Sequence, residues 1–265
     1  MAAERTDGEG TDRFLPLPTV GRVFTGHLQV RLGDVTPRRR ARLDAVARYL
    51  QDVAEDDAAD AGWPTDVGWV VRWTRLSVRR FPLLGERLRL DTFCSGTAAA
   101  WAERTTTIAG DGGASLQGTS VWVAVRPASG RPARLGERFD AVYAPSAGSR
   151  RATARLHLPP PTAAVRRGGR DWPLRTSDFD AWGHLNNAIS WAAVEDAMAG
   201  EAGPAPSTEA WPAPFSAEVE HHRAIEPGDR PVLCRSTDGT ALSAWLVDRR
   251  GVLTAARVWK WPWTS

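Results

Sequence analysis

The segment 175–187 combines residue types that could carry out hydrolytic chemistry at a carbonyl group. It holds two carboxylates, a Gly-His step and a pair of asparagines directly before a predicted helix. The residues concerned are Asp178, Asp180, Gly183, His184, Asn186 and Asn187. A carboxylate in such a place can activate water as a general base or attack a carbonyl carbon itself. Burial beneath an apolar ligand would shift its pKa towards that task.

The predicted helix start adds hydrogen-bond donors to this segment. The first N–H groups of a helix have no partner within the helix, and the helix dipole is positive at that end. We therefore expect the N–H groups of Gly183 and His184 to be free to stabilise an oxyanion. For Asp178 the favoured interpretation is a structural cap. For Asp180 and His184 a chemical role is favoured, because Asp, Gly-His and Asn-Asn occur together.

The pair His221–His222 is the second feature that could carry chemistry. Adjacent residues of a strand point to opposite faces, so the two imidazoles cannot easily bind one metal ion. We expect one to face a pocket and the other to face solvent. The sequence contains no G-x-S-x-G elbow, Walker loop or H-E-x-x-H motif that would compete for a catalytic role.

Hydrophobic periodicity indicates two rounds of the same element order. Residues 39–60 and 185–198 show the three- and four-residue spacing of amphipathic helices. Hairpin signals at Ser95-Gly96 and Asp111-Gly112-Gly113 separate strand-like runs. The predicted strands are 23–30, 69–78, 87–93, 99–108 and 115–125 in the first half, and 171–175, 215–223, 231–236, 241–247 and 253–259 in the second.

Sequence matches between the halves indicate a tandem duplication. Gly85-Glu86 matches Gly228-Asp229 at a spacing of 143 residues, and Val121-Trp122 matches Val258-Trp259 at a spacing of 137. Each unit is a helix with an antiparallel sheet, and the helix covers the face that the sheet must bury. Joining two such sheets edge to edge removes exposed edges. The sequence therefore predicts an α+β fold, a tandem double hotdog with antiparallel sheets each wrapped around a long central helix.

Composition excludes several other classes of protein. The 265 residues are 42% apolar and 25% charged, which is typical of a globular chain. The net charge of +3 comes without a long basic run, so nucleic-acid binding is disfavoured. No apolar window is long enough for a membrane span. The polar N-terminus does not resemble a signal peptide, and two cysteines are too few for a disulfide scaffold. We expect a cytoplasmic protein.

The string Asp178-x-Asp180-x-x-Gly183-His184-x-Asn186-Asn187 resembles the signature of hotdog thioesterases. The first half resembles the acyl-acyl-carrier-protein (acyl-ACP) thioesterase family, in a bacterial, actinobacterial-like form. The segments that carry this resemblance are Val30-Arg31, Asp34, 47–54, 69–72, Phe81-Pro82-x-x-Gly85-Glu86, 92–96 and 120–122. The resemblance spans roughly residues 20–262. The second-half motif alone specifies an acyl-thioester enzyme, and the first half narrows it to the acyl-ACP type.

The resemblance implies roles for individual residues. The catalytic Asp of the family falls on Asp180 and its catalytic His on His184, while Gly183 and Asn187 would bind or position the carbonyl. Plant plastid members carry an Asn two residues after the Asp, where this chain has Trp182. An indole cannot accept a hydrogen bond as an Asn carbonyl does. We expect Trp182 to pack as a wall beside the thioester, which would narrow and dry the site.

A second departure from the plant members concerns a Glu on the strand before the Gly-Asp turn. That position falls on Ala224 or Ile225. Glu220 and Glu226 are nearby, but strand alternation does not guarantee that either reaches the site. The plant mechanism therefore cannot be transferred whole.

The expected function is hydrolysis of acyl-ACP to free fatty acid in fatty acid biosynthesis, with no metal or organic cofactor. The partner would be the acyl-carrier protein with its acyl-phosphopantetheine, and a homodimer is one candidate assembly. The alternatives are an acyl-CoA thioesterase of the same fold and a non-hydrolytic acyl-binding protein; an enoyl-thioester hydratase is disfavoured.

The expected organisation is a disordered tail at 1–20, an N-terminal hotdog at 21–127 with the acyl-chain tunnel, a linker or crossover at 128–170, and a catalytic C-terminal hotdog at 171–265.

Overall fold

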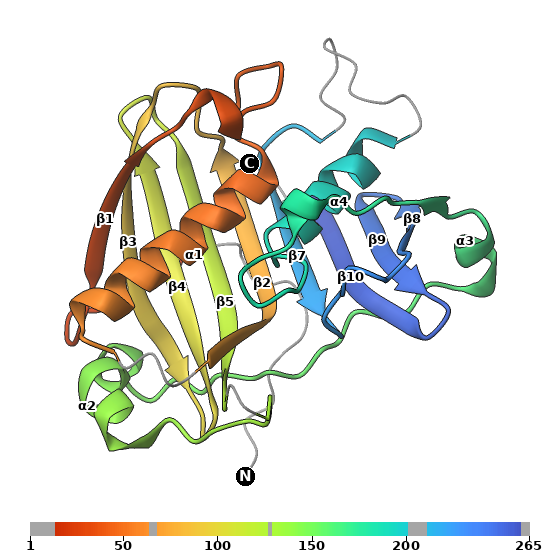
Figure 1. Cartoon of the computed structure of the whole chain (residues 1–265). Coiled ribbons are helices and arrows are strands. Elements are labelled where there is room, and N and C mark those ends of the chain that lie inside the picture. The colour runs from red at the N-terminus through yellow and green to blue at the C-terminus, as the bar shows by residue number, and fades with distance from the viewer. Residues whose placement is uncertain (1–13, 64–67, 127–128, 201–210, 261–265) are drawn as a thin grey trace.

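The computed structural model describes residues 14–63, 68–126, 129–200 and 211–260, and Figure 1 shows their elements. The strands are β1 Phe24–Gln29, β2 Gly68–Arg80, β3 Arg87–Thr97, β4 Trp101–Gly110, β5 Ser115–Val125, β6 Arg170–Asp171, β7 Phe215–His221, β8 Val232–Asp238, β9 Ala241–Asp248 and β10 Gly251–Lys260. The helices are α1 Leu43–Asp60, α2 Gly136–Ala147, α3 Ala163–Arg167 and α4 Ile189–Ala199, with short 3-10 turns η1 Leu32–Asp34 and η2 Thr176–Asp178. Within these ranges no helix is both long and apolar enough to span a membrane.

The strands form one ten-stranded antiparallel sheet whose order repeats. The first half has the order β1-β3-β4-β5-β2, and the second half has β6-β8-β9-β10-β7, which is the same order element for element. The halves join where β2 pairs with β7, from Trp73 opposite Glu220 to Val78 opposite Phe215. In each half a helix connects the first strand to the second. This arrangement confirms the predicted tandem double hotdog.

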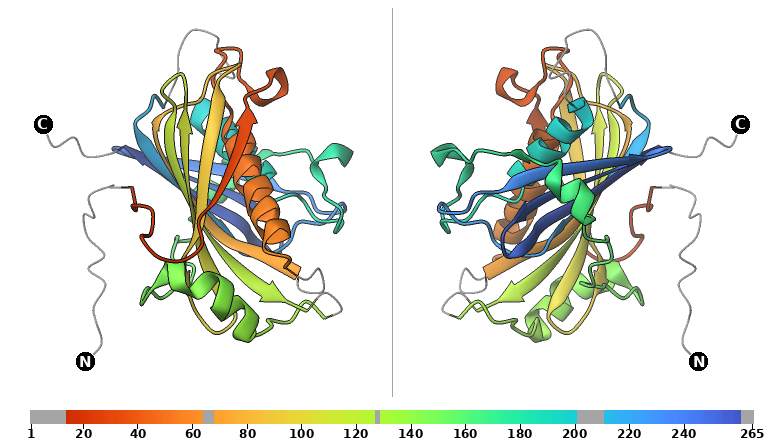
Figure 2. Two further views of the ribbon diagram at one scale, coloured as in Figure 1. Left: turned by 90° about the vertical axis from the view of Figure 1, so that its left-hand side faces the viewer. Right: turned by 90° about the vertical axis from the view of Figure 1, so that its right-hand side faces the viewer.

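The two long helices lie against the same face of the sheet (Figures 1 and 2). Helix α1 buries Leu43, Val46, Leu50 and Val53, which recur every three or four residues. Because a fully buried aliphatic side chain contributes ~1.5–3 kcal/mol, this stripe accounts for much of the attachment of the helix. A Cβ on Gly118 of β5 would clash with Leu50, so the close approach of helix and strand requires glycine there. Side chains of α1 and α4 belong to one continuous core.

Both helices begin four residues later than the periodicity predicts, at Leu43 and Ile189. The preceding residues form a tight loop instead. In the first half Arg39 has a φ of 66°, which a helix cannot accommodate. In the second half Leu185 forms a β-bridge with Phe179. The predicted turn at Ser95-Gly96 is also wrong, because β3 continues through it with a β-bulge between Cys94 and Gly96.

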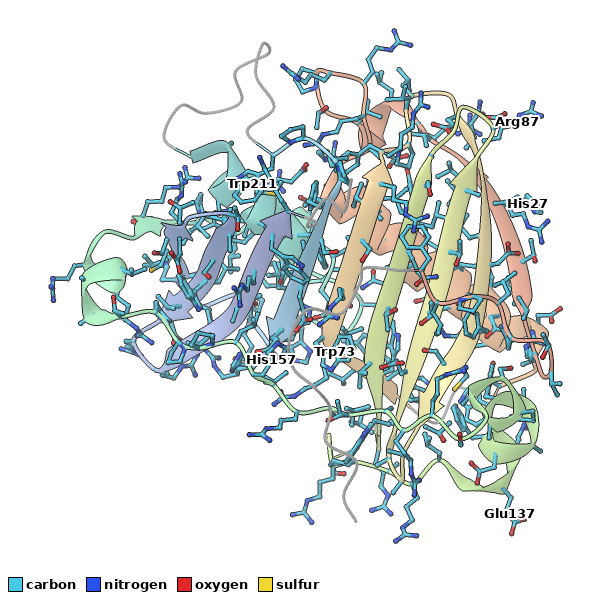
Figure 3. All side chains as sticks on the ribbon, turned by 180° about the vertical axis from the view of Figure 1, so that it is seen from behind. His27, Trp73, Arg87, Glu137, His157 and Trp211 are labelled. Atoms are coloured by element: carbon cyan, nitrogen blue, oxygen red, sulfur yellow. The ribbon has the colours of Figure 1, made fainter. Side chains whose placement is uncertain are left out.

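The crossover between the halves runs over the face of the sheet that the helices leave open (Figure 3). Three indole N–H groups hold it by its backbone carbonyls: Trp73 donates to Thr153 at 2.9 Å, Trp101 to Ala152 at 3.2 Å and Trp245 to Pro159 at 2.9 Å. The chain has thirteen tryptophans, and these three use the polar edge of a large apolar ring to anchor a long connection.

The first described residues, 14–20, have no regular structure but are attached to the sheet. Leu15 exchanges two hydrogen bonds with the Gln117 side chain on β5. Residues 1–13 of the predicted tail lie outside the described residues.

The crossover also contains helix α2, which the sequence did not predict. The domain boundaries at 21–127, 128–170 and 171–265 stay a prediction.

Candidate active site

The segment before α4 starts with a capped turn. The Asp178 carboxylate, 2% exposed, accepts a hydrogen bond from the Arg175 backbone N–H at 2.8 Å and lies 2.9 Å from the Arg175 guanidinium. It closes the 3-10 turn η2 in this way. All of its described contacts are within this turn, and this is the structural role that the sequence predicts for Asp178.

A five-residue loop from Asp180 to His184 follows the capped turn. The Asp180 N–H donates to the His184 carbonyl at 2.9 Å, and the Gly183 N–H donates to the Asp180 carbonyl at 3.0 Å. One carboxylate oxygen of Asp180, Oδ1, accepts from the N–H groups of Trp182 at 2.9 Å and His184 at 3.4 Å. Gly183 has a φ of 77°, a conformation that glycine adopts without strain. The loop therefore fixes the Asp180 carboxylate and leaves Oδ2 without a partner in the described part of the chain.

These bonds correct the expectation that the N–H groups of Gly183 and His184 are free. Both donate to Asp180, and helix α4 begins only at Ile189. Asn186 closes a side-chain turn just before the helix, because its Oδ1 accepts from the Ala188 N–H at 2.9 Å. Asn187 has neither its N–H nor its side-chain amide bonded to another described residue. It is thus the donor that remains available at this helix start.

The same loop occurs in the first half with different side chains. There the Thr36 N–H donates to the Arg40 carbonyl and the Arg39 N–H to the Thr36 carbonyl, both at 2.8 Å. Thr36 and Arg40 take the places of Asp180 and His184. The Arg40 guanidinium lies 2.6 Å from Glu195 on α4, in an ion pair. The first-half loop therefore lacks the carboxylate and imidazole of its counterpart.

A cavity of about 310 Å³ at the seam between the halves brings together the predicted residues Asp180, Trp182, His184 and Asn187, whereas Gly183 is not among its lining residues. We call it the junction cavity. Its polar lining residues are Arg72, Asp180, His184, Asn187, Ser190, His221, His222, Arg223 and Thr254, with Trp69 and Trp182 among the apolar ones. Asp180 is the one carboxylate among these residues. The cavity therefore collects an acid, imidazoles, amide donors and two guanidinium groups in one place.

His221 is the functional candidate that sequence reasoning left unresolved. Strand β7 ends at this residue, so the strict alternation that separates the two faces stops before His222. Both residues line the junction cavity, but Nε2 of His222 lies 3.3 Å from the Glu220 carboxylate on the other side of the strand. Neither residue is fully exposed, which corrects the expectation that one faces solvent. The Nε2 atom of His221 is buried without a hydrogen-bond partner. Burial, with the nearby His222 and Arg72, lowers the pKa of His221 from 6.5 to about 4, so the ring is neutral at neutral pH.

The Glu residues near His221 do not reach the junction cavity. The Glu220 carboxylate is fully buried on the opposite side of β7, where it accepts from the His157 N–H at 2.6 Å and the Leu158 N–H at 3.2 Å. Glu226 lies exposed in the following turn. Ala224 and Ile225 line the cavity. Neither Glu220 nor Glu226 therefore contributes a carboxylate to it.

A group that could hold a metal ion lies on the outer face, away from Asp180. The ligand atoms of His157, Glu218 and Glu220 come within 4.8 Å of one another. The two imidazole nitrogens, however, face different carboxylates, at 3.5 Å from Glu218 and 3.1 Å from Glu220. Arg75 also lies 2.7 Å from Glu218. The His157 ring thus bridges two carboxylates by ion-pair contacts, so we assign no metal to this group.

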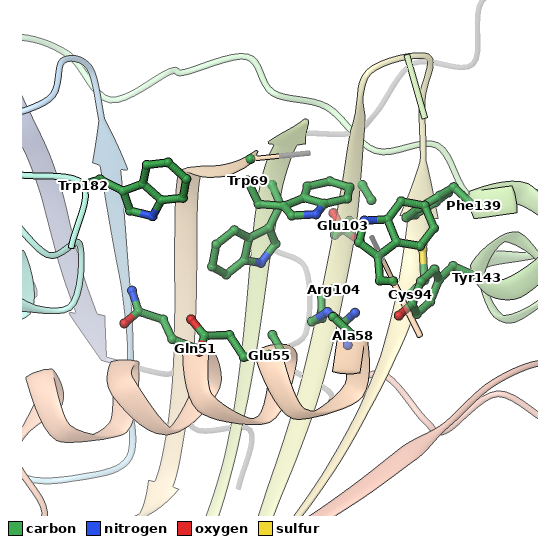
Figure 4. Close-up of a pocket in the computed structure, with 15 residues that line it drawn as sticks. Gln51, Glu55, Ala58, Trp69, Cys94, Glu103, Arg104, Phe139, Tyr143 and Trp182 are labelled. Atoms are coloured by element: carbon green, nitrogen blue, oxygen red, sulfur yellow. The ribbon is translucent and has the colours of Figure 1, made fainter. Parts of the chain in front are cut away.

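A second cavity, of about 240 Å³, lies between α1 and the first-half strands, and Figure 4 shows its lining. We call it the aromatic cavity. Its aromatic lining residues are Trp63, Trp69, Trp122, Phe139, Tyr143 and Trp182. Phe139 and Tyr143 stack at 5.1 Å between ring centroids at the end opposite Trp182. Both come from α2, in the region that the sequence predicts as a linker, so sequence reasoning missed them.

Trp182 and Trp69 line both cavities, which therefore adjoin. Trp182 is 69% exposed, which corrects the expectation of a buried wall. Cys94 lies at the far end of the aromatic cavity, and burial raises the pKa of its thiol to about 11. A thiol with that pKa is not ionised at neutral pH and is a poor nucleophile. The Asp180 and His184 side chains thus lie in one cavity, and the next has an aromatic wall together with Glu55, Glu103 and Arg104.

Comparison with known proteins places a family match in the first half of the chain. Residues 21–143 match the model of the acyl-ACP thioesterase N-terminal domain. Over this segment the chain is similar to the acyl-ACP thioesterase family. Among solved structures of the same fold, the 12:0-ACP thioesterase from Umbellularia californica aligns with a TM-score of 0.71 at 17% identity, over 91% of this chain and 97% of that one. An acyl-ACP thioesterase from Bacteroides thetaiotaomicron aligns with a TM-score of 0.67 at 14% identity, over 89% and 97%.

An uncharacterized protein of Mycobacterium tuberculosis is 26% identical over 215 residues, which covers 80% of this chain and 82% of that protein. The family match covers every lining residue of the aromatic cavity except Trp182, and helix α2 as far as Tyr143. The Asp180 loop lies outside the matched segment.

Proposed function

We propose that this protein hydrolyses acyl-ACP thioesters and releases free fatty acids, with Asp180 as its catalytic carboxylate. One observation carries the assignment of the site: Asp180 and His184 line a cavity that adjoins an aromatic-walled cavity in the acyl-ACP thioesterase domain. The acyl chain would occupy the aromatic cavity, and its thioester would lie in the junction cavity near Trp182. No metal or organic cofactor is required for this reaction.

In the proposed reaction, Oδ2 of Asp180 takes a proton from water while the water oxygen attacks the thioester carbon. Oδ1 is held by the N–H groups of Trp182 and His184, so Oδ2 is the oxygen available for this proton. The carbon–sulfur bond then breaks, and the leaving thiolate receives the proton. Water and thioester are thereby converted to carboxylic acid and thiol. Asn187 and the His184 imidazole are the donors that would stabilise the oxyanion.

Direct attack by Asp180 on the carbonyl is the alternative, and isotope labelling separates the two. A single turnover in H₂¹⁸O places ¹⁸O in the fatty acid if water attacks. If Asp180 attacks, an acyl-enzyme anhydride forms and water can open it at the Asp180 carbon. The first-turnover fatty acid is then unlabelled and the label appears in a peptide that contains Asp180. Mass spectrometry of the acid and of the peptides reads out both results.

The carrier is tested by a panel of acyl-ACP and acyl-CoA substrates of matched chain length, with free thiol and free fatty acid measured together. Higher kcat/KM for acyl-ACP supports the proposal. Higher kcat/KM for acyl-CoA favours the acyl-CoA thioesterase. A stable acyl complex without turnover favours the non-hydrolytic acyl-binding protein. Arg72 lines the junction cavity and could pair with the phosphate of phosphopantetheine, whereas the Arg223 guanidinium is held by Asp229 and Asp248.

A cytoplasmic location and a homodimer belong to this proposal as well. Light scattering of the purified protein measures its mass in solution, and fractionation of expressing cells locates it. A monomeric mass would remove the homodimer from the proposal without affecting the reaction.

A further inference from the structure

His221 lies between the junction cavity and a much smaller one behind it. The smaller cavity, of about 10 Å³, is lined by Gln51, Thr74, Ser120, Asn187 and His221 among its polar residues. His221 and Asn187 line both cavities. These two side chains therefore form part of the wall between a reaction space and a buried polar niche.

The niche has the size and the chemistry to orient the His221 ring. About 10 Å³ is close to the space that a single water molecule needs, and such a water requires two to four polar partners. Thr74 and Ser120 bond to each other at 2.8 Å, and each hydroxyl oxygen retains acceptor capacity. A water in the niche would pair with the buried Nε2 atom of His221 and so satisfy it. The ring would then be held from behind.

The other ring nitrogen of His221, Nδ1, is accessible. Neither ring nitrogen bonds to a described residue, and Nε2 is the one of the two that is fully buried. Nδ1 is therefore not fully buried, and the larger cavity that His221 lines is the junction cavity. The charged or titratable groups around the ring are Arg72, Asp180, His184, His222 and Arg223. A neutral imidazole among them can accept a hydrogen bond, whereas an imidazolium cannot.

We propose that His221 is a catalytic residue of this site, which binds the hydrolytic water through its imidazole ring and presents it to Asp180. The proposal rests on the proposed function. One hydrogen of the water is donated to Oδ2 of Asp180 and the other to Nδ1 of His221. Asp180 takes its proton as the oxygen attacks, and the hydrogen on the His221 side stays on the oxygen in the acid product. His221 thus supplies a hydrogen-bond acceptor for the water in the junction cavity, which Glu220 and Glu226 do not reach.

The test compares His221→Leu, which removes both nitrogens, with His221→Gln, which keeps a hydrogen-bond acceptor. We expect His221→Leu to lower kcat about 10²-fold with KM changed less than threefold, since a positioned acid–base group contributes ~10²–10⁴. His221→Gln should retain at least ten times the activity of His221→Leu. The affinity for a non-hydrolysable acyl thioether of CoA should be unchanged in both. His27→Leu, at an exposed position of β1, is the matched control.

A double-mutant cycle with Asp180→Asn tests whether the His221 and Asp180 side chains hold the same water. The combined loss in kcat should be smaller than the product of the single losses. A folded His221→Leu that keeps kcat within threefold overturns the proposal. Equal losses in His221→Leu and His221→Gln, together with lowered melting temperatures, would make His221 structural and also overturn it. Failure of the wild type to hydrolyse any acyl-ACP or acyl-CoA overturns the proposed function itself.

Discussion

Asp180 and His184 are joined by two hydrogen bonds that close a loop: the Asp180 N–H donates to the His184 carbonyl at 2.9 Å, and the His184 N–H donates to the side-chain Oδ1 of Asp180 at 3.4 Å. The conformation of this loop does not require a charged carboxylate at position 180, because the amide oxygen of an asparagine can accept the same hydrogen bonds. Side-chain chemistry can therefore be changed here without removing the contacts that hold the backbone.

Asp180→Asn should lose hydrolysis and keep the fold. The substitution retains Oδ1 as an acceptor and removes the basic oxygen, and loss of a general base costs ~10²–10⁴ in rate. Thiol release from acyl-ACP measures the rate, and circular dichroism measures the fold. Asp178→Asn is the matched control, because Asp178 contacts Arg175 within its turn; it should lower the melting temperature and leave kcat within threefold. Wild-type turnover in a folded Asp180→Asn would remove Asp180 from the mechanism.

His184→Ala should lower turnover more than stability. The imidazole is exposed in the junction cavity and makes no side-chain hydrogen bond to the residues that the structure describes. Removing one donor to an oxyanion typically costs ~10²–10³ in kcat. Kinetics and thermal unfolding on the same preparation separate the two effects. A large fall in melting temperature at unchanged kcat would make His184 a structural residue.

Trp182→Ala should change substrate preference at little cost in stability. The ring is 69% exposed, so its removal leaves no buried void, and we expect the free energy of unfolding to change by less than ~0.5 kcal/mol. Because Trp182 lines both cavities, its loss should widen the passage between them and raise the relative kcat/KM of bulky acyl groups. Denaturant unfolding and an acyl-chain panel measure the two quantities. An unchanged panel would leave the ring without a role.

Ala58→Phe should shift the preference towards shorter acyl chains. Ala58 lies on α1 and lines the aromatic cavity, so a phenyl ring there fills space that a chain would use. One methylene in an apolar pocket is worth ~10–200-fold in discrimination, and we expect at least a tenfold change in the ratio of long-chain to short-chain kcat/KM. Ala59→Phe is the control, because Ala59 is exposed and has the same helix-propensity cost. Equal effects of the two variants would contradict an acyl chain in this cavity.

Stability should fall as the pH is lowered from about 6.5 to about 4, in part because of His221. Burial holds the pKa of the native imidazole at about 4, whereas the ordinary value is 6.5. Between those values the unfolded chain binds a proton that the native protein does not, so the free energy of unfolding decreases by up to ~1.4 kcal/mol per pH unit. Urea unfolding at several pH values measures the slope. His221→Gln should flatten it, while His27→Gln should not; equal slopes in all three proteins would contradict a buried neutral His221.

The sequence by itself determined the double hotdog and the segment that carries the chemistry. Period-two and period-3.6 patterns identified the sheet and the two long helices, because burial of one face imposes those spacings locally. The grouping of Asp180, His184 and Asn187 within eight residues predicted their shared cavity, since residues so close in sequence cannot lie far apart. Asp178 was predicted as a cap for the same local reason.

Contacts between distant segments decided the rest. The N–H groups of Gly183 and His184 bond to Asp180 because the chain from Phe179 to Leu185 folds back on itself before the helix begins, and helix periodicity contains no information on that loop. His222 joins His221 at the junction cavity because β7 ends there, which pairing with β2 and β10 decides. Phe139 reaches the aromatic cavity from α2, in the region that the sequence predicts as a linker. Such positions depend on which surfaces pack together, and only the tertiary structure specifies that.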